Sequence, residues 1–277
     1  MGPLVSVIVP TYNSASTLDE CLTALKNQEY GNIEIIVADS FSKDRTKDIA
    51  SHYGAKIIDA STLALARKSG VEASNGKYIL FLDSDQIIEP DTIRRSVQAC
   101  EAAGYDGVTH FERSKIHKGT FVERLINYDK WIFHSEQDDD PIYGTAEPRF
   151  FKSEFVKKID FLDNPPITFE LAIINLKMNQ LGAKIGFIDA YIYHYETPTF
   201  RKVAKKFFRY GLYYIPALKR FPSLVIHHSA PRRTYFTARA LTHPFLLFGL
   251  FVLYGIKGLA TFCGIISYAL KPKCQTN

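Results

Sequence analysis

The chain has 277 residues, of which 46% are hydrophobic, and this is enough to bury a substantial core. Its four cysteines are far apart and include no CxxC pair, which argues against a zinc site or a disulfide framework and suits a reducing compartment. The net charge is +5, but residues 201–277 contain 13 Lys and Arg and no Asp or Glu.

This charge distribution limits the classes of partner. The first 200 residues carry 21 of the 34 basic side chains and all 29 acidic ones, so an acidic body precedes a purely basic tail. Such a tail is typical of proteins that bind nucleic acid or an anionic membrane surface. The residues that lie between the bases distinguish these two partners.

Apolar runs and amphipathic stretches alternate through the first hundred residues. β-Branched apolar runs predict buried strands at 4–9, 33–39, 55–59 and 77–83. Apolar residues at helical spacing, with Asn13 or Ser14 as the cap, predict a first helix, and further helices are expected at 44–53, 62–75 and 91–103. The alternation predicts an α/β fold, a mostly parallel, Rossmann-like sheet flanked by helices.

Acidic residues close two of these strands. Asp39 follows the second strand and Asp83 the fourth, where the sequence reads D-S-D at 83–85. In open parallel sheets, ligands bind beyond the carboxyl ends of the strands, so the two residues are expected to converge on one crevice. Asp and Ser are also common turn residues, and the tripeptide alone is weak evidence. Paired carboxylates suit hard cations such as Mg²⁺ or Mn²⁺.

The second half of the chain is less regular. Strands are expected at 105–111 and 185–193, and helices at 121–134 and 168–181. Residues 135–148 form a polar stretch with Pro and Gly that is long enough to be a functional loop.

From about residue 198 the composition changes, which predicts a first domain at 1–197 and a basic, helical, membrane-binding region at 198–277. Bases and aromatics alternate at a helical rhythm, and residues 244–270 then contain one charge, Lys257. The run is long enough to cross a bilayer, but its central lysine and four glycines favour an in-plane helix pair or a re-entrant hairpin at least as well. A buried helix of a globular domain is the remaining alternative. The long apolar run favours a lipid partner and no nucleic acid.

Three motifs in order carry a resemblance. VSVIVPTYNSASTLDECLTAL, IEIIVADSFSKDRT and ALARKSGVEASNGKYILFLDSDQIIEPD together resemble the family 2 glycosyltransferases of the GT-A fold. The resemblance is strong over residues 4–91 and continues to about residue 196. It implies an enzyme that takes a sugar from a nucleoside-diphosphate donor.

The resemblance assigns roles to residues of the first half. Pro10, Thr11, Tyr12 and Asn13 would form part of the nucleotide pocket. Asp39 would accept a hydrogen bond from the base, Arg67 would lie near the phosphates, and Ser84 belongs with Asp83 to the donor site. Ser40 and Phe41 depart from the family pattern of acids and glycine, so the choice between uracil and guanine stays open.

The same comparison implies a metal and a base. Asp83, Asp85 and His194 would hold Mn²⁺ or Mg²⁺ at the donor diphosphate, although a histidine after an apolar strand is as often structural. The position that usually carries the catalytic carboxylate in this family is occupied by Thr168 here. Glu170, two residues on, is the favoured base, Asp163 is an alternative, and a capping or surface role is the alternative for Glu170.

The sequence therefore predicts an inverting, metal-dependent glycosyltransferase at the cytoplasmic face of the cell membrane, with a hydroxyl of a lipid or lipid-linked molecule as acceptor. Polyprenyl phosphate is a second possible acceptor, because a phosphate needs little help from a base. A non-catalytic sugar-nucleotide-binding scaffold is a third reading, which the intact Asp83 and Asp85 disfavour. A nucleotidyltransferase ranks lower, since PTYNSAS contains no glycine.

Overall fold

The structure is a computed structural model, and it describes residues 2–62, 65–133, 148–160, 167–230, 235 and 241–270. The chain forms two compact units that are interleaved in sequence. The first, called the sheet unit, comprises residues 1–115, 138–165 and 170–195. The second, called the helical unit, comprises residues 116–137, 166–169 and 196–277, so part of it lies within the region expected to be catalytic.

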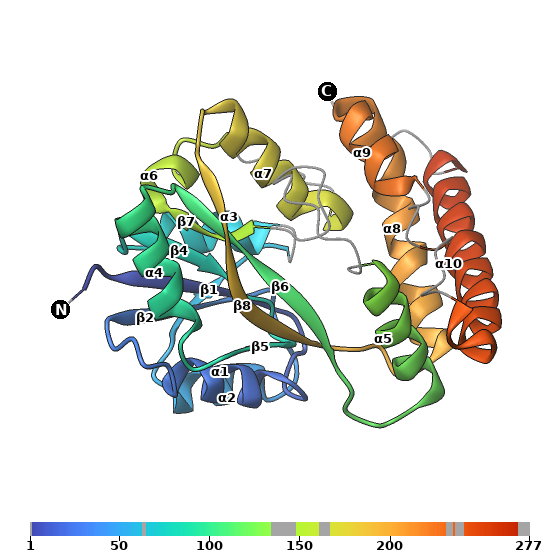
Figure 1. The fold of residues 1–277 in the computed structure, drawn as a ribbon, viewed down its shortest axis with the longest axis horizontal. Helices are drawn as coiled ribbons and strands as arrows, with labels where there is room; N and C mark the ends of the chain where they lie inside the picture. Colours follow the sequence, from blue (N-terminus) through green and yellow to red (C-terminus); the bar gives the residue numbers. More distant parts are fainter. Residues whose placement is uncertain are drawn as a thin grey trace. The chain divides into compact units, whose positions relative to one another are not determined.

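The sheet unit is built on one sheet of eight strands in the order β3-β2-β1-β4-β7-β6-β8-β5 (Figure 1). The strands are β1 Val5–Thr11, β2 Ile33–Asp39, β3 Lys56–Asp59, β4 Tyr78–Phe81, β5 Gln86–Ile88, β6 Gly107–Lys115, β7 Pro148–Lys152 and β8 Ile185–Tyr195. Its helices are α1 Leu18–Lys26, α2 Thr46–His52, α3 Ala66–Glu72, α4 Thr92–Ala103, α6 Ser153–Val156 and α7 Glu170–Gln180.

The direction of pairing changes halfway across the sheet. β1 pairs in parallel with β2 and β4, and β2 with β3, which confirms the parallel α/β arrangement predicted for the first half. β7 is antiparallel to both β4 and β6. β8 is parallel to β6, and the short β5 is antiparallel to β8. Four of the seven pairings in the described sheet are therefore parallel.

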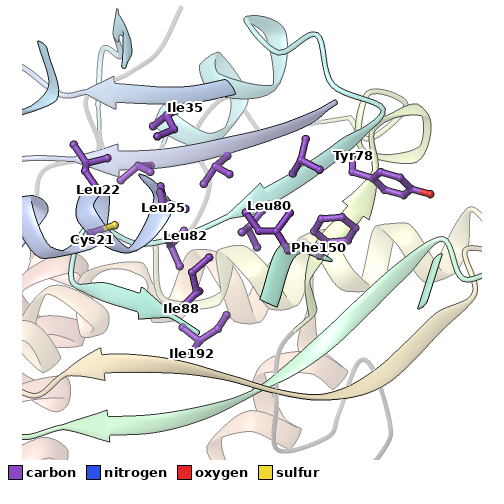
Figure 2. Packing of buried hydrophobic residues seen from close by; sticks show 14 of the residues in the cluster. Cys21, Leu22, Leu25, Ile35, Tyr78, Leu80, Leu82, Ile88, Phe150 and Ile192 are labelled. Atoms are coloured by element: carbon purple, nitrogen blue, oxygen red, sulfur yellow. The ribbon is translucent and has the colours of Figure 1, made fainter. Parts of the chain in front are cut away.

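Successive residues of the central strands face opposite sides of the sheet, so each strand contributes to two cores. Val7 and Leu80 belong to the core that packs under α1 and α4, whose cluster Figure 2 shows. Ile8 and Ile79 belong to the core under α3, α6 and α7. On this second side α3 comes very close: a Cβ on Gly70 would lie 2.3 Å from Cγ2 of Ile8.

Several local expectations were wrong. α1 begins only at Leu18, and the side-chain oxygen of Ser14 accepts from the backbone of Tyr12 instead of capping the helix. α3 covers Ala66–Glu72, so it is shorter than the helix expected at 62–75. β5 and β7 were missed, because three and five residues are too few to show a period.

The helical unit consists of α5 Phe121–Phe133, the 3₁₀ turn η2 Ile167–Phe169, α8 Phe200–Arg220, α9 Pro222–Ser229 and α10 Pro244–Leu270. α10 is one continuous helix of 27 residues, so the expected helix pair or hairpin is wrong. It is long and apolar enough to cross a membrane by length and composition, which core helices of soluble proteins also are. Most of its apolar window is not buried inside the protein.

α8 and α10 pack together through glycine (Figure 1). A Cβ on Gly211 of α8 would lie 2.1 Å from the backbone oxygen of Thr261, and one on Gly264 of α10 would lie 2.2 Å from that of Phe208. No side chain fits between backbones this close, so the two glycines fix where the helices cross.

Candidate active site

The candidate site lies where neighbouring parallel strands end. Thr11 at the end of β1 is the register partner of Asp39 at the end of β2, and the amide of Ser40 donates to the carbonyl of Thr11. Leu82, just after β4, donates its amide to the carbonyl of Ile8 in β1. The three strands thus deliver the predicted motif residues to one edge of the sheet.

Asp39 is fully buried, and its carboxylate holds this edge together. Thr11 Oγ1 donates to Oδ1 at 2.8 Å, and Ser42 donates its hydroxyl to Oδ1 at 2.6 Å and its amide to Oδ2 at 2.9 Å. Lys47 Nζ lies 3.7 Å from Oδ2. Pro10 and Thr11 are also buried, within β1. These two predicted pocket residues and Asp39 therefore shape the strand ends from the inside.

Tyr12 and Phe41, by contrast, follow the same two strand ends and are exposed, at 55% and 58%. Phe41 has φ 58° and Asn13 has φ 51°, a region that non-glycine residues rarely adopt. Hydrogen bonds hold both turns: the amide of Asn13 donates to Ser42 Oγ, and the amide of Lys43 donates to Asn13 Oδ1, each at 2.8 Å. Two aromatic rings are thus displayed on braced turns at the edge of the sheet.

Asp83 lies just beyond β4, and two arginines hold it. Arg67 of α3 donates to Oδ1, and Arg149 of β7 donates to Oδ2 at 3.1 Å. Gln86 Oε1 accepts from the backbone amide of Asp83 at 2.9 Å, which fixes the turn of the D-S-D motif. Both oxygens of Asp83 therefore already have a cationic partner.

The two arginines extend this contact into a network. Arg67 also donates to Oε2 of Glu170, the first residue of α7, and Arg149 lies 3.5 Å from Oε2 of Glu112 on β6. Arg67, Arg149 and Glu170 are buried. Residues far apart in sequence are thereby tied around Asp83.

Asp85 is placed differently from Asp83. Its side chain is 43% exposed, and its Oδ2 lies 3.4 Å from Nε2 of His194. The pairing of β5 with β8 causes this contact, because it sets Gln86 opposite His194 and lets the amide of Tyr195 donate to the carbonyl of Asp85 at 2.9 Å. The structure thus brings together two of the three predicted metal ligands.

A cation at Asp85 and His194 would need further ligands. Within the described ranges, no three or more His, Cys, Asp and Glu side chains gather as a metal-holding group. A carboxylate and an imidazole suit Mn²⁺, and such ions commonly complete their shell with water and substrate phosphates. The donor set therefore fits a metal that is bound together with a diphosphate.

The charge around the D-S-D turn is negative. Asp83, Asp85, Glu112 and Glu170 provide four carboxylates against the guanidinium groups of Arg67 and Arg149. The negative charge affects the nearby thiol of Cys21 in α1. Burial raises the pKa of this thiol, and the charges of Asp85 and Asp83 raise it further. Negative potential at an exposed carboxylate attracts a cation.

Ser84 and Ser14 link the D-S-D turn to the turn after β1. Ser84 Oγ donates to Ser14 Oγ at 2.9 Å, and Ser14 is held in turn by its amide, which donates to Thr46 Oγ1 at 2.8 Å. Ser84 therefore joins the turn that carries Asp85 to the one that carries Tyr12.

Sequence reasoning missed Arg149, Glu112 and Gln86. Arg149 follows Pro148 in a short apolar strand, and an arginine directly before two aromatic residues, Phe150 and Phe151, was the available signal. Asp163 and the polar stretch up to residue 147 lie outside the described residues. Thr168, at the position of the usual base, belongs to the helical unit, and its hydroxyl is buried with no partner among the described residues.

Solved structures share this fold. The mannosyltransferase PcManGT from Pyrobaculum calidifontis, in complex with GDP-Man and Mn²⁺, superposes with a TM-score of 0.59 at 16% identity over 98% of this chain and 76% of its own. S. aureus TarS 1-349 in complex with UDP-GlcNAc gives 0.56 at 18% identity, over 96% and 89%. At such low identity the likeness concerns the fold.

Sequence relatives point the same way. The chain is 41% identical over 96 residues to the glycosyltransferase EpsH of Bacillus subtilis, which is 32% of this chain and 28% of EpsH. It is 26% identical over 220 residues to the glycosyltransferase AglE of Haloferax volcanii, or 76% and 72%. It spans 61% of the length of EpsJ of Bacillus subtilis. The model described as Glycosyl transferase family 2 matches residues 6–161, and the chain belongs to that family.

Proposed function

We propose that this protein is an inverting, metal-dependent glycosyltransferase that moves a sugar from a UDP- or GDP-linked donor to a hydroxyl of a lipid or lipid-linked acceptor. The reaction takes place at the cytoplasmic face of the cell membrane. The observation that carries the proposal is the pair of the exposed Asp85 and the partly buried His194 at the sheet edge, beside the arginine-held Asp83.

Asp85 and His194 would hold the cation, with Asp83 as a predicted third ligand. When bound, Mn²⁺ or Mg²⁺ neutralises charge on the departing nucleoside diphosphate. Since both oxygens of Asp83 accept from guanidinium groups, Asp85 ranks first as the metal ligand. Arg67 and Arg149 supply fixed positive charge next to the phosphates, where arginine can bind two oxygens at once.

The nucleoside half of the donor would lie at the ends of β1 and β2. Tyr12 offers an exposed ring at this edge, and the turn of Asn13 is braced by Ser42 and Lys43. Asp39 would accept from the base only with the capacity left by Thr11 and Ser42, because two hydroxyls and an amide already donate to it.

Glu170 stays the predicted base for a hydroxyl acceptor. Its Oε2 already accepts a hydrogen bond from Arg67, so an acceptor hydroxyl would compete with the guanidinium group for this carboxylate. This favours polyprenyl phosphate as a second candidate acceptor, because its oxygen needs no deprotonation at neutral pH.

Glu170→Gln separates the two acceptors. The change keeps the shape and one hydrogen bond to Arg67, so a base role predicts a fall in kcat of about 10²-fold or more with KM little changed. A near-normal kcat with a hydroxyl acceptor would remove Glu170 from the reaction. Transfer to a polyprenyl phosphate should survive the change in either case.

Membrane association rests on the basic tail. Thirteen bases and no acid lie in residues 201–277, and each base near an anionic leaflet contributes about 1 kcal/mol to binding. The apolar α10 adds area that the protein itself leaves largely uncovered.

Thermal stabilisation of the detergent-purified protein tests the donor. UDP, GDP and their common sugars would each be added with and without Mn²⁺. We expect one nucleotide to raise Tm in a Mn²⁺-dependent manner, and Asp85→Asn to abolish the Mn²⁺ dependence. If no nucleotide raises Tm under any condition, a non-catalytic role replaces the proposal.

A further inference from the structure

We propose that α10 lies in the plane of one membrane leaflet and does not cross the bilayer, with an anionic lipid surface as its partner. The inference rests on the proposed membrane association and deepens it. It concerns the helical unit alone, so it can fail while donor binding and transfer stand.

α10 has two unlike faces. Gly249, Leu250, Leu253 and Gly264 are buried against the rest of the helical unit. Apart from Tyr254, which hydrogen-bonds to Asp129, the large apolar side chains of α10 with at least 40% of their surface exposed form the outer stripe: Phe245, Phe248, Phe251, Val252, Leu259, Phe262, Ile266 and Leu270. Such a helix has one side for protein and one for lipid.

The single charge of α10 points away from the outer stripe. Lys257 Nζ lies 2.8 Å from Oδ2 of Asp129 on α5. Tyr235 and Tyr254 both donate to Oδ1 of the same carboxylate, at 2.7 and 2.8 Å. Both partners of the ion pair are nearly buried, so α10 cannot leave α5 without exposing a carboxylate and an ammonium group.

α8 accompanies α10 along its middle. The ring of Phe207 lies 5.4 Å from Lys257 Nζ, and Gly211 meets Gly264 one to two turns further on. This part of α8 carries five bases, Arg201, Lys202, Lys205, Lys206 and Arg209. If α10 crossed the bilayer, its middle would lie in the hydrocarbon core, and these bases of α8 would lie there too.

The cost of that arrangement excludes it. A base near the bilayer midplane disfavours insertion about a hundredfold, so five of them cannot be offset by the outer stripe. In the plane of the interface there is no such conflict. The outer stripe enters the acyl region by roughly 5–10 Å, and the bases stay at the level of the phosphates.

Accessible cysteines at the two ends of α10 test the topology. Thr242→Cys and Ala269→Cys would be made separately in the full chain carrying Cys263→Ser and Cys274→Ser. The other two cysteines, Cys21 and Cys100, are buried. Each variant is expressed in cells, and sealed inside-out membrane vesicles are treated with a membrane-impermeant maleimide.

We expect both cysteines to react in sealed vesicles to the extent reached after permeabilisation. A span of 27 residues would instead be about 40 Å long and place its ends on opposite sides. Reaction of one end only after permeabilisation would overturn the proposal.

Vesicle binding tests the partner. The purified protein is added to liposomes of phosphatidylcholine with and without 30 mol% phosphatidylglycerol, a composition chosen for the probe. Phe248→Ser with Phe262→Ser should weaken binding at least tenfold. Leu181→Ser, a substitution at an exposed leucine of the sheet unit, should not change it. Equal binding by the stripe variant, or a stable dimer in solution that the stripe variant dissolves, would refute lipid as the occupant.

Discussion

The two units place their apolar residues in opposite ways. Of nineteen large apolar side chains exposed among the described residues, the sheet unit has three, and two of these, Tyr12 and Phe41, adjoin the candidate site. The other sixteen belong to the helical unit and concentrate on α10. In the sheet unit the exposed apolar side chains are few and separate, whereas in the helical unit they form a continuous surface.

Charge shows the same contrast. The sheet unit gathers carboxylates and arginines around Asp83 at the strand ends. In the helical unit, the ion pair between Asp129 of α5 and Lys257 of α10 is largely buried, whereas most bases of α8 are exposed. In the function proposed above, the first unit would bind a small anionic ligand and the second would meet an extended anionic surface.

The largest expected effect tests the sheet unit. Asp85→Ala should lower kcat by about 10²-fold or more, because it removes the most exposed candidate metal ligand. Tm without ligand should hardly change. Asp48→Ala, at an exposed aspartate of α2, is the matched control. Mn²⁺-dependent transfer at the wild-type rate in the Asp85 variant would contradict the assignment.

The second effect tests the helical unit. Gly264→Ala should destabilise the crossing of α8 and α10 by about 1–3 kcal/mol, because its Cβ would overlap a backbone oxygen that cannot move aside. Gly258→Ala in the same helix meets no atom within 4 Å and should be neutral or slightly stabilising. Denaturant unfolding in detergent compares them, and equal stabilities would mean that the helices do not cross there.

A third prediction concerns pH. Burial, with Arg149 and Arg95 nearby, lowers the pKa of His110 from 6.5 to about 3. The unfolded chain therefore binds a proton below pH 6.5 that the folded chain does not, and stability should fall as pH drops from 6.5 toward 3.

The hydrogen bonding of His110 in the sheet unit allows the predicted pH dependence to be tested by a substitution. Its Nε2 lies 2.9 Å from Ser96 Oγ, which itself donates to the carbonyl of Thr92. His110→Gln should flatten the decline in Tm between pH 7 and pH 5 relative to wild type. A decline of unchanged steepness would assign the pH dependence to other groups.

The smallest effect concerns Phe41. Phe41→Gly should relieve the φ of 58° and stabilise the fold by roughly 0.5–1 kcal/mol. The same change should weaken nucleotide binding a few-fold if the ring packs against the base. Phe41→Asn, which also tolerates this backbone, is the control, and titration calorimetry supplies Kd. Unaltered Kd in both variants would exclude contact with the ring.

The sheet could be predicted where its pattern is long. The run IEIIVAD matches β2 residue for residue, because five of its seven positions are apolar and β-branched residues dominate. β7 could not be found in this way. Phe150 of β7 pairs with Leu80 of β4, which is seventy positions away in the sequence. Only the assembled sheet shows that β7 lies between β4 and β6.

Part of the candidate site could be named from the sequence, but its network could not. The motifs named Arg67 and Asp83, and Glu170 was chosen two residues beyond the motif position, yet the sharing of one guanidinium between two carboxylates joins positions 103 residues apart. Arg149 lay outside every motif. No local pattern carries such contacts, because they depend on which strands become neighbours.

The position of β7 also sets an order of events during synthesis. Once α4 has emerged, β1 to β4 can pair, but β4 keeps an open edge until residue 152 is made. At 5–20 residues per second, roughly two to seven seconds pass between the end of β6 and the end of β7. Strand pairing takes microseconds, so β6 has ample time to add to β4 in the wrong place. The charged end of β6, Glu112 to Lys115, lacks the paired aromatics Phe150 and Phe151 that lie opposite Leu80 and Ile79, and this difference favours β7 as the neighbour of β4.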